Sequence, residues 1–233
     1  LKKINSLFGS IPSKPIPTRK PQLAPPPIGS KEILVNPSIK TNVPMVIIGY
    51  TTPSLVTAKE PWQPYALEVA AGILSGGNSA RLPKELVRQK QSAIEASADY
   101  NMYSRYDNQF MLFGAVNNMK KMPQLKQDLL NQIKKLQQFL VSPGELKRIK
   151  NQVIAENVFE KDSVFGQAME IGVLETIGIG HQASIAYVSK INAVTAKQIQ
   201  EVARLYFTPQ NMTVATLVPN TPPTNQAKAG APS

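Results

Sequence analysis

The alternation of apolar and polar positions predicts strands at intervals along the chain. Residues 32–35, with the sequence Glu-Ile-Leu-Val, predict a short strand, and Val43–Thr51 is apolar on both faces, which is typical of a buried central strand. Two runs with strand character, Ser92–Met102 and Asn108–Val116, lie close enough together to form a hairpin. The last run, Asn211–Val218, predicts a closing strand.

Apolar positions at helical spacing predict helices between these strands. One helix fills residues 61–76 and stops at the pair Gly76–Gly77, and a short helix follows over residues 79–89. Beyond Met122 the pattern stays helical for most of the distance to the closing strand. The first helix of this region carries an apolar stripe, with Lys and Gln opposite: Leu125, Leu129, Ile133, Leu136 and Leu140.

Two helix starts carry the sequence of a capping box, in which a Ser or Thr and a Glu or Gln three residues later bond free backbone N–H groups. Ser142–Glu145 is one of them, with Pro143 at the first helical position, and its helix is predicted to continue to about residue 160. Thr195–Gln198 is the other, and it opens a helix that ends before the closing strand.

The element order and the distribution of proline divide the chain into three parts. Residues 1–30 are interpreted as the end of a helix from a preceding domain plus a linker, because the seven prolines in residues 12–27 exclude helix and central strand. Residues 31–219 are expected to form one domain, and residues 220–233 a disordered tail. The order of strands and helices predicts an α+β fold, with antiparallel pairing across the hairpin.

Missing residue types exclude several kinds of chemistry. The chain has no cysteine and a single histidine, His181. A zinc site built from Cys and His, a disulfide and a cysteine nucleophile are therefore excluded, and a Ser-His-Asp triad would depend on His181 alone. No apolar run approaches the roughly 18 residues that a membrane span needs.

The formal net charge of +11 is concentrated near the N-terminus. Residues 1–31 contain no acid, and their basic residues account for over half of the excess: Lys2, Lys3, Lys14, Arg19, Lys20 and Lys31. The rest of the chain is only mildly basic. A basic flexible segment is usually solvated, so nucleic acid is not expected as a partner.

Several segments, in their order and spacing, resemble insulinase-type (pitrilysin-family) zinc peptidases. Leu74–Arg88, with the sequence LSGGNSARLPKELVR, is similar to the Gly-rich turn, Ser-x-Arg-Leu and Leu-Arg segment of that family. Leu1–Pro17 is similar to the helix and linker that close the first half of such proteins. Val43–Thr51, the long helices and Asn192–Val218 resemble the second half.

The resemblance implies a mainly antiparallel sheet of about five or six strands with helices packed on one face. It also implies a homologous catalytic half, upstream in the same chain or in a separate subunit, which encloses a chamber for peptides together with this one. In such enzymes the catalytic half carries an H-x-x-E-H motif, whose His residues bind zinc while the Glu activates water. This chain lacks the motif, so zinc is expected in the partner half, no cofactor here, and no activity from this chain alone.

The family also places an Arg and, seven residues later, a Tyr near the scissile carbonyl. Arg88 stands at the Arg position, and its guanidinium is suited to binding a peptide carbonyl, which makes it a candidate for substrate binding. Glu95 stands where the family has Tyr. An ionised carboxylate cannot stabilise an oxyanion, so no catalytic residue is assigned to this chain. The structural alternative for Arg88 is a favourable interaction with the end of its own helix.

Other noticeable residues have structural interpretations. Arg81 is expected to tie its turn to a neighbouring element, and Gly76–Gly77 to end a helix rather than cradle a phosphate. Glu95 is expected to face solvent or pair with a Lys or Arg, and His181 to lie in a loop or at a helix start. The tyrosines near the hairpin are able to stack on a peptide, although such residues more often cover sheet edges: Tyr100, Tyr103 and Tyr106.

Three functions follow from these observations. The leading hypothesis is the non-catalytic half of a zinc metalloendopeptidase, which binds peptide substrates and closes the chamber. The second is an inactive homologue that scaffolds a complex, as core subunits of a respiratory complex do in the same superfamily, and Glu95 favours it slightly. The third is a basic nucleic-acid-binding module, which requires binding that survives removal of residues 1–30. Whether the chain forms a homodimer is left open. The resemblance suggests a periplasmic or cell-envelope location.

Overall fold

The computed structural model describes most of the predicted domain. The residues that it describes are 2–12, 29, 31–35, 43–160 and 163–219. Most of the predicted linker and the predicted tail over residues 220–233 lie outside them. The part of the chain that the structure describes contains no helix long and apolar enough to cross a membrane.

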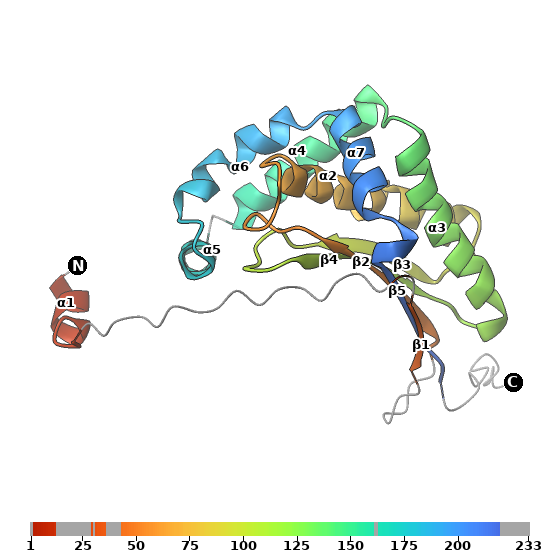
Figure 1. Cartoon of the computed structure of the whole chain (residues 1–233), viewed down its shortest axis with the longest axis horizontal. Helices are drawn as coiled ribbons and strands as arrows, with labels where there is room; N and C mark the ends of the chain where they lie inside the picture. Colours follow the sequence, from red (N-terminus) through yellow and green to blue (C-terminus); the bar gives the residue numbers. More distant parts are fainter. Residues whose placement is uncertain (1, 13–28, 30, 36–42, 161–162, 220–233) are drawn as a thin grey trace, which may run out of the picture.

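A five-stranded sheet forms the base of the domain (Figure 1). Its strands are β1 (Lys31–Val35), β2 (Met45–Thr52), β3 (Glu95–Tyr100), β4 (Asn108–Ala115) and β5 (Met212–Leu217). The order across the sheet is β1-β5-β2-β4-β3. β1 and β5 are parallel, while the other neighbours, including the predicted hairpin β3–β4, are antiparallel. The α+β class and the mainly antiparallel sheet are thus confirmed.

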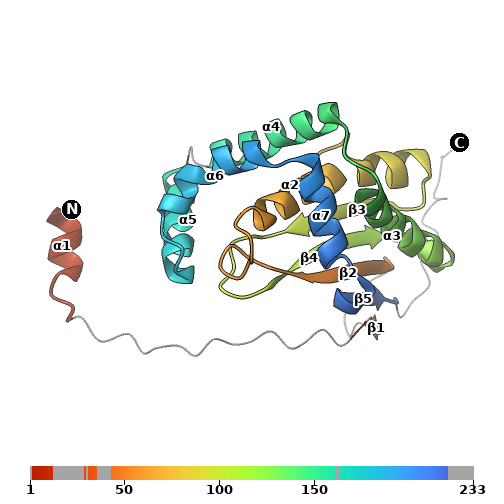
Figure 2. The same ribbon diagram turned by 45° about the horizontal axis from the view of Figure 1, so that its top comes forward.

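The helices gather on one face of this sheet, and Figure 2 shows the same arrangement from a second direction. α2, α3, α4, α6 and α7 cover that face, while α5 lies at the end where the β3–β4 hairpin turns. The described helices are α1 (Lys2–Phe8), α2 (Gln63–Ser75), η1 (Leu82–Gln89), η2 (Met119–Lys121), α3 (Met122–Gln138), α4 (Pro143–Glu160), α5 (Val164–Ile177), α6 (Gln182–Ala193), α7 (Ala196–Tyr206) and η3 (Pro209–Asn211).

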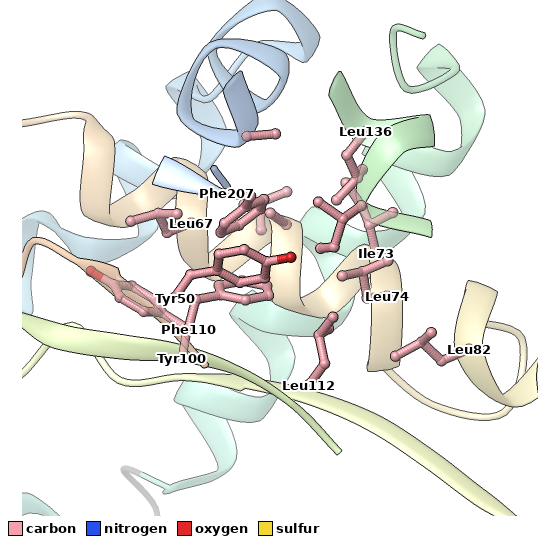
Figure 3. Packing of buried hydrophobic residues seen from close by; sticks show 14 of the residues in the cluster. Tyr50, Leu67, Ile73, Leu74, Leu82, Tyr100, Phe110, Leu112, Leu136 and Phe207 are labelled. Carbon is pink, nitrogen blue, oxygen red and sulfur yellow. The ribbon is translucent and has the colours of Figure 1, made fainter. Parts of the chain in front are cut away.

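The core lies between the sheet and these helices. Alternate residues of each strand point toward the helices, since successive side chains of a strand face opposite sides. From β2 these residues include Tyr50, and from β4 Phe110, and both are fully or nearly fully buried. Phe207, directly after α7, packs on both rings, with centroid distances of 5.2 Å to Tyr50 and 4.5 Å to Phe110 (Figure 3). α7 is thereby fixed over the centre of the sheet.

The helix starts and ends are partly as predicted. The capping box at Thr195 is confirmed, with both of its reciprocal hydrogen bonds to Gln198 present. The box at Ser142 is only half formed, because the Glu145 carboxylate bonds Arg81 instead. The inclusion of Leu140 in the apolar stripe was wrong: α3 ends at Gln138 and Leu140 is 52% exposed.

The short helix predicted over residues 79–89 forms as η1, with the wider hydrogen bonding of a π-helix. Its last bond runs from the N–H of Lys90 to the carbonyl of Glu85. The chain then turns through Gln91, whose φ of 51° lies in the left-handed region that few residues other than glycine adopt. The direction in which β3 leaves η1 is set by this turn.

We expect Ile48 and Ile47, neighbours on β2, to differ sharply in their contribution to stability. Ile48→Ala should lower the free energy of unfolding by about 2–5 kcal/mol, because a fully buried side chain is replaced by a cavity. Ile47→Ala should cost less than about 1 kcal/mol, since Ile47 points away from the helices and is 42% exposed. Urea unfolding followed by circular dichroism measures both; equal losses would mean that both faces of β2 are covered.

Candidate functional site

The face of the sheet opposite the helices is called here the open face, and two of its rows of cross-strand neighbours are apolar across four strands, while the following rows include Lys31, Thr213 and Gln109. Cross-strand pairing places one row of neighbours on it: Ile33, Ala215, Ile47 and Phe113. The next row is Val35, Leu217, Met45 and Ala115. The strands β1, β5, β2 and β4 therefore carry two adjoining apolar rows, exposed at Ile33, Val35 and Ile47 and buried at Ala115, which no helix among the described residues covers.

The open face corrects one prediction. Val43–Thr51 was expected to be buried on both faces because both are apolar, yet only the face carrying Val46, Ile48 and Tyr50 is buried by the helices. Ile47 on the other face is substantially exposed. Exposed apolar patches of this kind mark surfaces that meet a partner or a ligand.

The open face becomes polar and acidic at β3. Glu95, Ser97 and Asp99 continue the rows that begin at β4, and Glu95 and Asp99 are exposed. β3 is the last strand of the sheet and pairs, among the described residues, with β4 alone. The outer edge of β3 therefore presents backbone groups to which an extended segment is able to pair.

The structure places the two predicted site residues on either side of the turn between η1 and β3. Arg88, in the last turn of η1, is exposed, and its guanidinium donates a hydrogen bond to the backbone carbonyl of Asn78 in the turn after α2. Glu95 begins β3 and lies on the open face as an exposed strand residue. Their contact with substrate stays a prediction.

Two ion pairs tie η1 to α3. Lys90 Nζ lies 2.6 Å from Asp128 Oδ1, and Lys135 Nζ lies 2.6 Å from Glu85 Oε2. The same Glu85 oxygen accepts a hydrogen bond of 2.7 Å from Gln132. These contacts hold the segment that carries Arg88 and leads into β3.

Asp128 is the most buried charged group of this junction, with only 1% of its side chain exposed. Burial opposes its ionisation and is the largest single effect, but the hydrogen bond and charge of Lys90, together with contributions from Ser92 and Gln124, outweigh it and lower the pKa of Asp128 below its ordinary value. The sequence analysis did not single out Asp128. The available signal was its spacing, since Asp128 and Gln132 fall among Leu125, Leu129 and Ile133 on the apolar side of α3 and are buried with them.

The turn between α2 and η1 is as the sequence indicated. Arg81 makes two hydrogen bonds of 2.9 and 2.7 Å to the carboxylate of Glu145, which confirms that it ties the turn to a neighbouring element, α4. Gly76 bonds back to the carbonyl of Gly72, and Gly77 has a φ of 77°. The glycine pair thus ends α2, and Gly77 takes the left-handed conformation that glycine adopts readily.

The remaining candidates have local roles. His181 lies directly before α6, and its Nδ1 is 2.8 Å from the Glu175 carboxylate, whose pKa is lowered by this contact. Within the described ranges, no three His, Cys, Asp or Glu side chains are grouped so as to hold a metal ion. Tyr100 is buried and donates a 2.6 Å hydrogen bond to the Pro53 carbonyl, so it anchors the end of β3.

A family model described as the peptidase M16 inactive domain matches residues 1–153 of the chain. No match was found among curated proteins. The match supports the resemblance to zinc peptidase halves drawn from the sequence.

Solved structures show the same fold. A protease from Helicobacter pylori superposes with a TM-score of 0.81 at 22% identity, over 94% of this chain and 52% of its own. A conserved protein from Enterococcus faecalis V583 gives 0.76 at 16% identity, over 97% and 50%. A chain of complex III2 from Candida albicans gives 0.69 at 14% identity, over 82% and 46%. This chain thus spans about half the length of each.

We expect Lys90→Met to destabilise the chain by about 1–3 kcal/mol at pH 7, because it leaves the Asp128 carboxylate buried without its cation. With Lys90 present, the pKa of Asp128 is lower in the folded chain than in the unfolded chain. Ionised Asp128 therefore contributes to stability above its unfolded-state pKa, and this contribution is lost as the pH falls through its folded-state pKa. In the variant the lowering of the pKa by Lys90 is lost while burial still opposes ionisation, so the deficit in unfolding free energy should shrink toward pH 4 as the folded variant takes up a proton at this carboxyl.

Urea titrations at pH 7 and pH 4 measure this difference. Lys84→Met is the matched control, since Lys84 is an exposed lysine on the same helix. If Lys90→Met lowers the free energy of unfolding by the same amount at both pH values, the role assigned to the Lys90–Asp128 pair is contradicted.

Proposed function

The chain belongs to the peptidase M16 inactive domain family, and from this premise we propose that it is the non-catalytic half of a zinc metallopeptidase, which binds peptide substrates and closes the chamber around them. The observation that carries the proposal is the open face, an apolar surface spread over four strands and left uncovered by the helices. Burying such a surface against a catalytic half or an unfolded peptide is favourable by roughly 25 cal/mol per Å².

The edge of β3 supports the same role. An unfolded peptide has unpaired backbone groups and apolar side chains, and it gains main-chain hydrogen bonds by adding to a free strand edge. β3 offers that edge directly beside the open face. Main-chain pairing accepts many sequences, which suits a protein that handles diverse peptides.

Arg88 is proposed to position the substrate carbonyl. Its bond to the Asn78 carbonyl holds the guanidinium near the turn, while the exposure of the side chain leaves it accessible. Glu95, exposed on the open face, is proposed to contact substrate only by charge, since it cannot take the part of a neutral hydrogen-bond donor while ionised. Zinc and the water that it activates are assigned to the catalytic partner half.

A scaffold function remains the second candidate. The chain shares its fold with part of a chain of complex III2 from Candida albicans, and an apolar sheet face serves equally well as a permanent subunit interface. The two functions differ in whether the open face accepts free peptides. For either function we propose a periplasmic or cell-envelope location, with which a chain free of cysteine is compatible.

We predict that the 233-residue chain binds unfolded peptides without hydrolysing them and without stoichiometric zinc. Fluorescence anisotropy with a labelled casein digest should show saturable binding. Ile47→Lys and Phe113→Lys should each weaken it about ten-fold, because each places a charge where about 1.4 kcal/mol of apolar contact is made. Metal analysis and a protease assay complete the measurement.

Leu205→Lys is the control, since Leu205 is an exposed apolar residue of α7, away from the open face. If the chain binds no peptide, or if Leu205→Lys weakens binding as much as Ile47→Lys and Phe113→Lys do, the substrate-binding role is overturned and the scaffold function is favoured. One tightly bound zinc with chelator-sensitive cleavage would overturn the non-catalytic assignment.

A further inference from the structure

Two cavities meet where β3 ends. The larger has a volume of about 430 Å³ and lies between α5, the last part of α4 and the segment after β3. Its wall is largely apolar, with contributions from Tyr103, Met169, Val173 and Leu174. A volume of this size accommodates a large aliphatic or aromatic side chain.

The smaller cavity, about 210 Å³, lies between β3, the end of α2 and α4. Small residues make room for it, among them Gly72, Gly77 and Ala98. The charged residues of its lining are all acids, namely Glu68, Glu156 and Asp99, although the side chain of Asp99 lies on the open face of the sheet. A polar space with the two carboxylates of Glu68 and Glu156 favours a basic side chain, and an Arg or Lys reaching in would form charge-assisted hydrogen bonds.

The two cavities adjoin along two elements. Tyr100 and Glu156 line the smaller cavity, while their sequence neighbours Asn101 and Asn157 line the larger one. Neither lining includes a Lys or Arg, although the whole chain carries a net charge of +11. The negative charge of this site is therefore a local property, and it is opposite in sign to the net charge of the chain.

The larger cavity is open to a ligand on its α5 side. Of the described side chains of α5 only Leu174 is buried, and Met169, at the cavity wall, is 52% exposed. The Oδ1 atom of Asn157 is buried and receives no hydrogen bond from any residue that the structure describes. It is an acceptor available to an N–H group of a ligand at the junction of the two cavities.

We propose that these cavities form a pair of specificity pockets for an extended peptide lying along the outer edge of β3, the smaller taking a basic side chain and the larger a nearby large apolar one. The inference rests on the proposed peptide-binding function and adds a sequence preference to it. Residues two positions apart in an extended chain point to the same side about 7 Å apart, which allows one peptide to fill neighbouring pockets. The free edge of β3 binds the backbone, and the pockets select the side chains.

The test uses labelled peptides of alternating Ser and Thr that carry one Arg and, two positions later, one Leu. Fluorescence anisotropy with the 233-residue chain should show that replacing the Arg by Glu, or the Leu by Ser, weakens binding about ten-fold or more. Glu156→Lys should remove the preference for Arg, and Met169→Trp, which fills the larger cavity, should remove the preference for Leu.

Two matched variants act as controls. Glu201→Lys changes an exposed acid of α7, and Ile185→Trp enlarges an exposed residue of α6, and neither residue lines a cavity of the pair. Both should retain both preferences. Melting curves from circular dichroism confirm that the pocket variants are folded before binding is compared.

The outcomes separate the two proposals. If all peptides bind equally, or if the pocket variants leave both preferences intact, the pockets are not specificity sites, while the general peptide-binding function stands. If no peptide binds to the folded chain at all, the proposed function fails and the specificity pockets fail with it.

Discussion

The structure depends on a sheet that, among the residues described, is packed by helices on one side only. Because side chains of a strand alternate between its faces, β2 sends Val46, Ile48 and Tyr50 into the helices and must send Met45 and Ile47 the other way. In a complete small domain the second set would be polar. Here it is apolar, and the neighbouring strands continue it, which is a composition suited to a surface that meets a partner or a ligand.

The helix side is organised to hold that sheet in place. Phe207 joins the end of α7 to the rings of Tyr50 and Phe110 at the centre of the core. The polar junction of η1 and α3 stabilises the edge of the sheet, where Asp128 pairs with Lys90 and Glu85 pairs with Lys135. An ion pair between a buried carboxylate and a half-exposed cation contributes little net stability. Removing the cation is nevertheless strongly destabilising, so the pair fixes one arrangement of the turn into β3.

The edge of β3 is where the different features converge. The free strand edge, the exposed Glu95 and Asp99 and the two cavities lie along the same strand or at its end. The open face and this edge present complementary chemistry, apolar in the middle and acidic at the rim. A basic and apolar peptide would match both.

Local physics determined much of this protein from sequence. Alternating and helical spacing located the strands and most helices, and the capping sequence at Thr195 predicted a helix start. The absence of cysteine and the single histidine excluded a zinc site built from Cys and His.

The tertiary structure decided what depends on residues far apart. It made β1 a parallel neighbour of β5, diverted Glu145 from its cap to Arg81 and left Leu140 exposed beyond the end of α3. It also gathered cavity walls from four separate segments between Glu68 and Leu174. Sequence periodicity reports which side of an element is apolar, but only packing decides whether that side is covered, and by what.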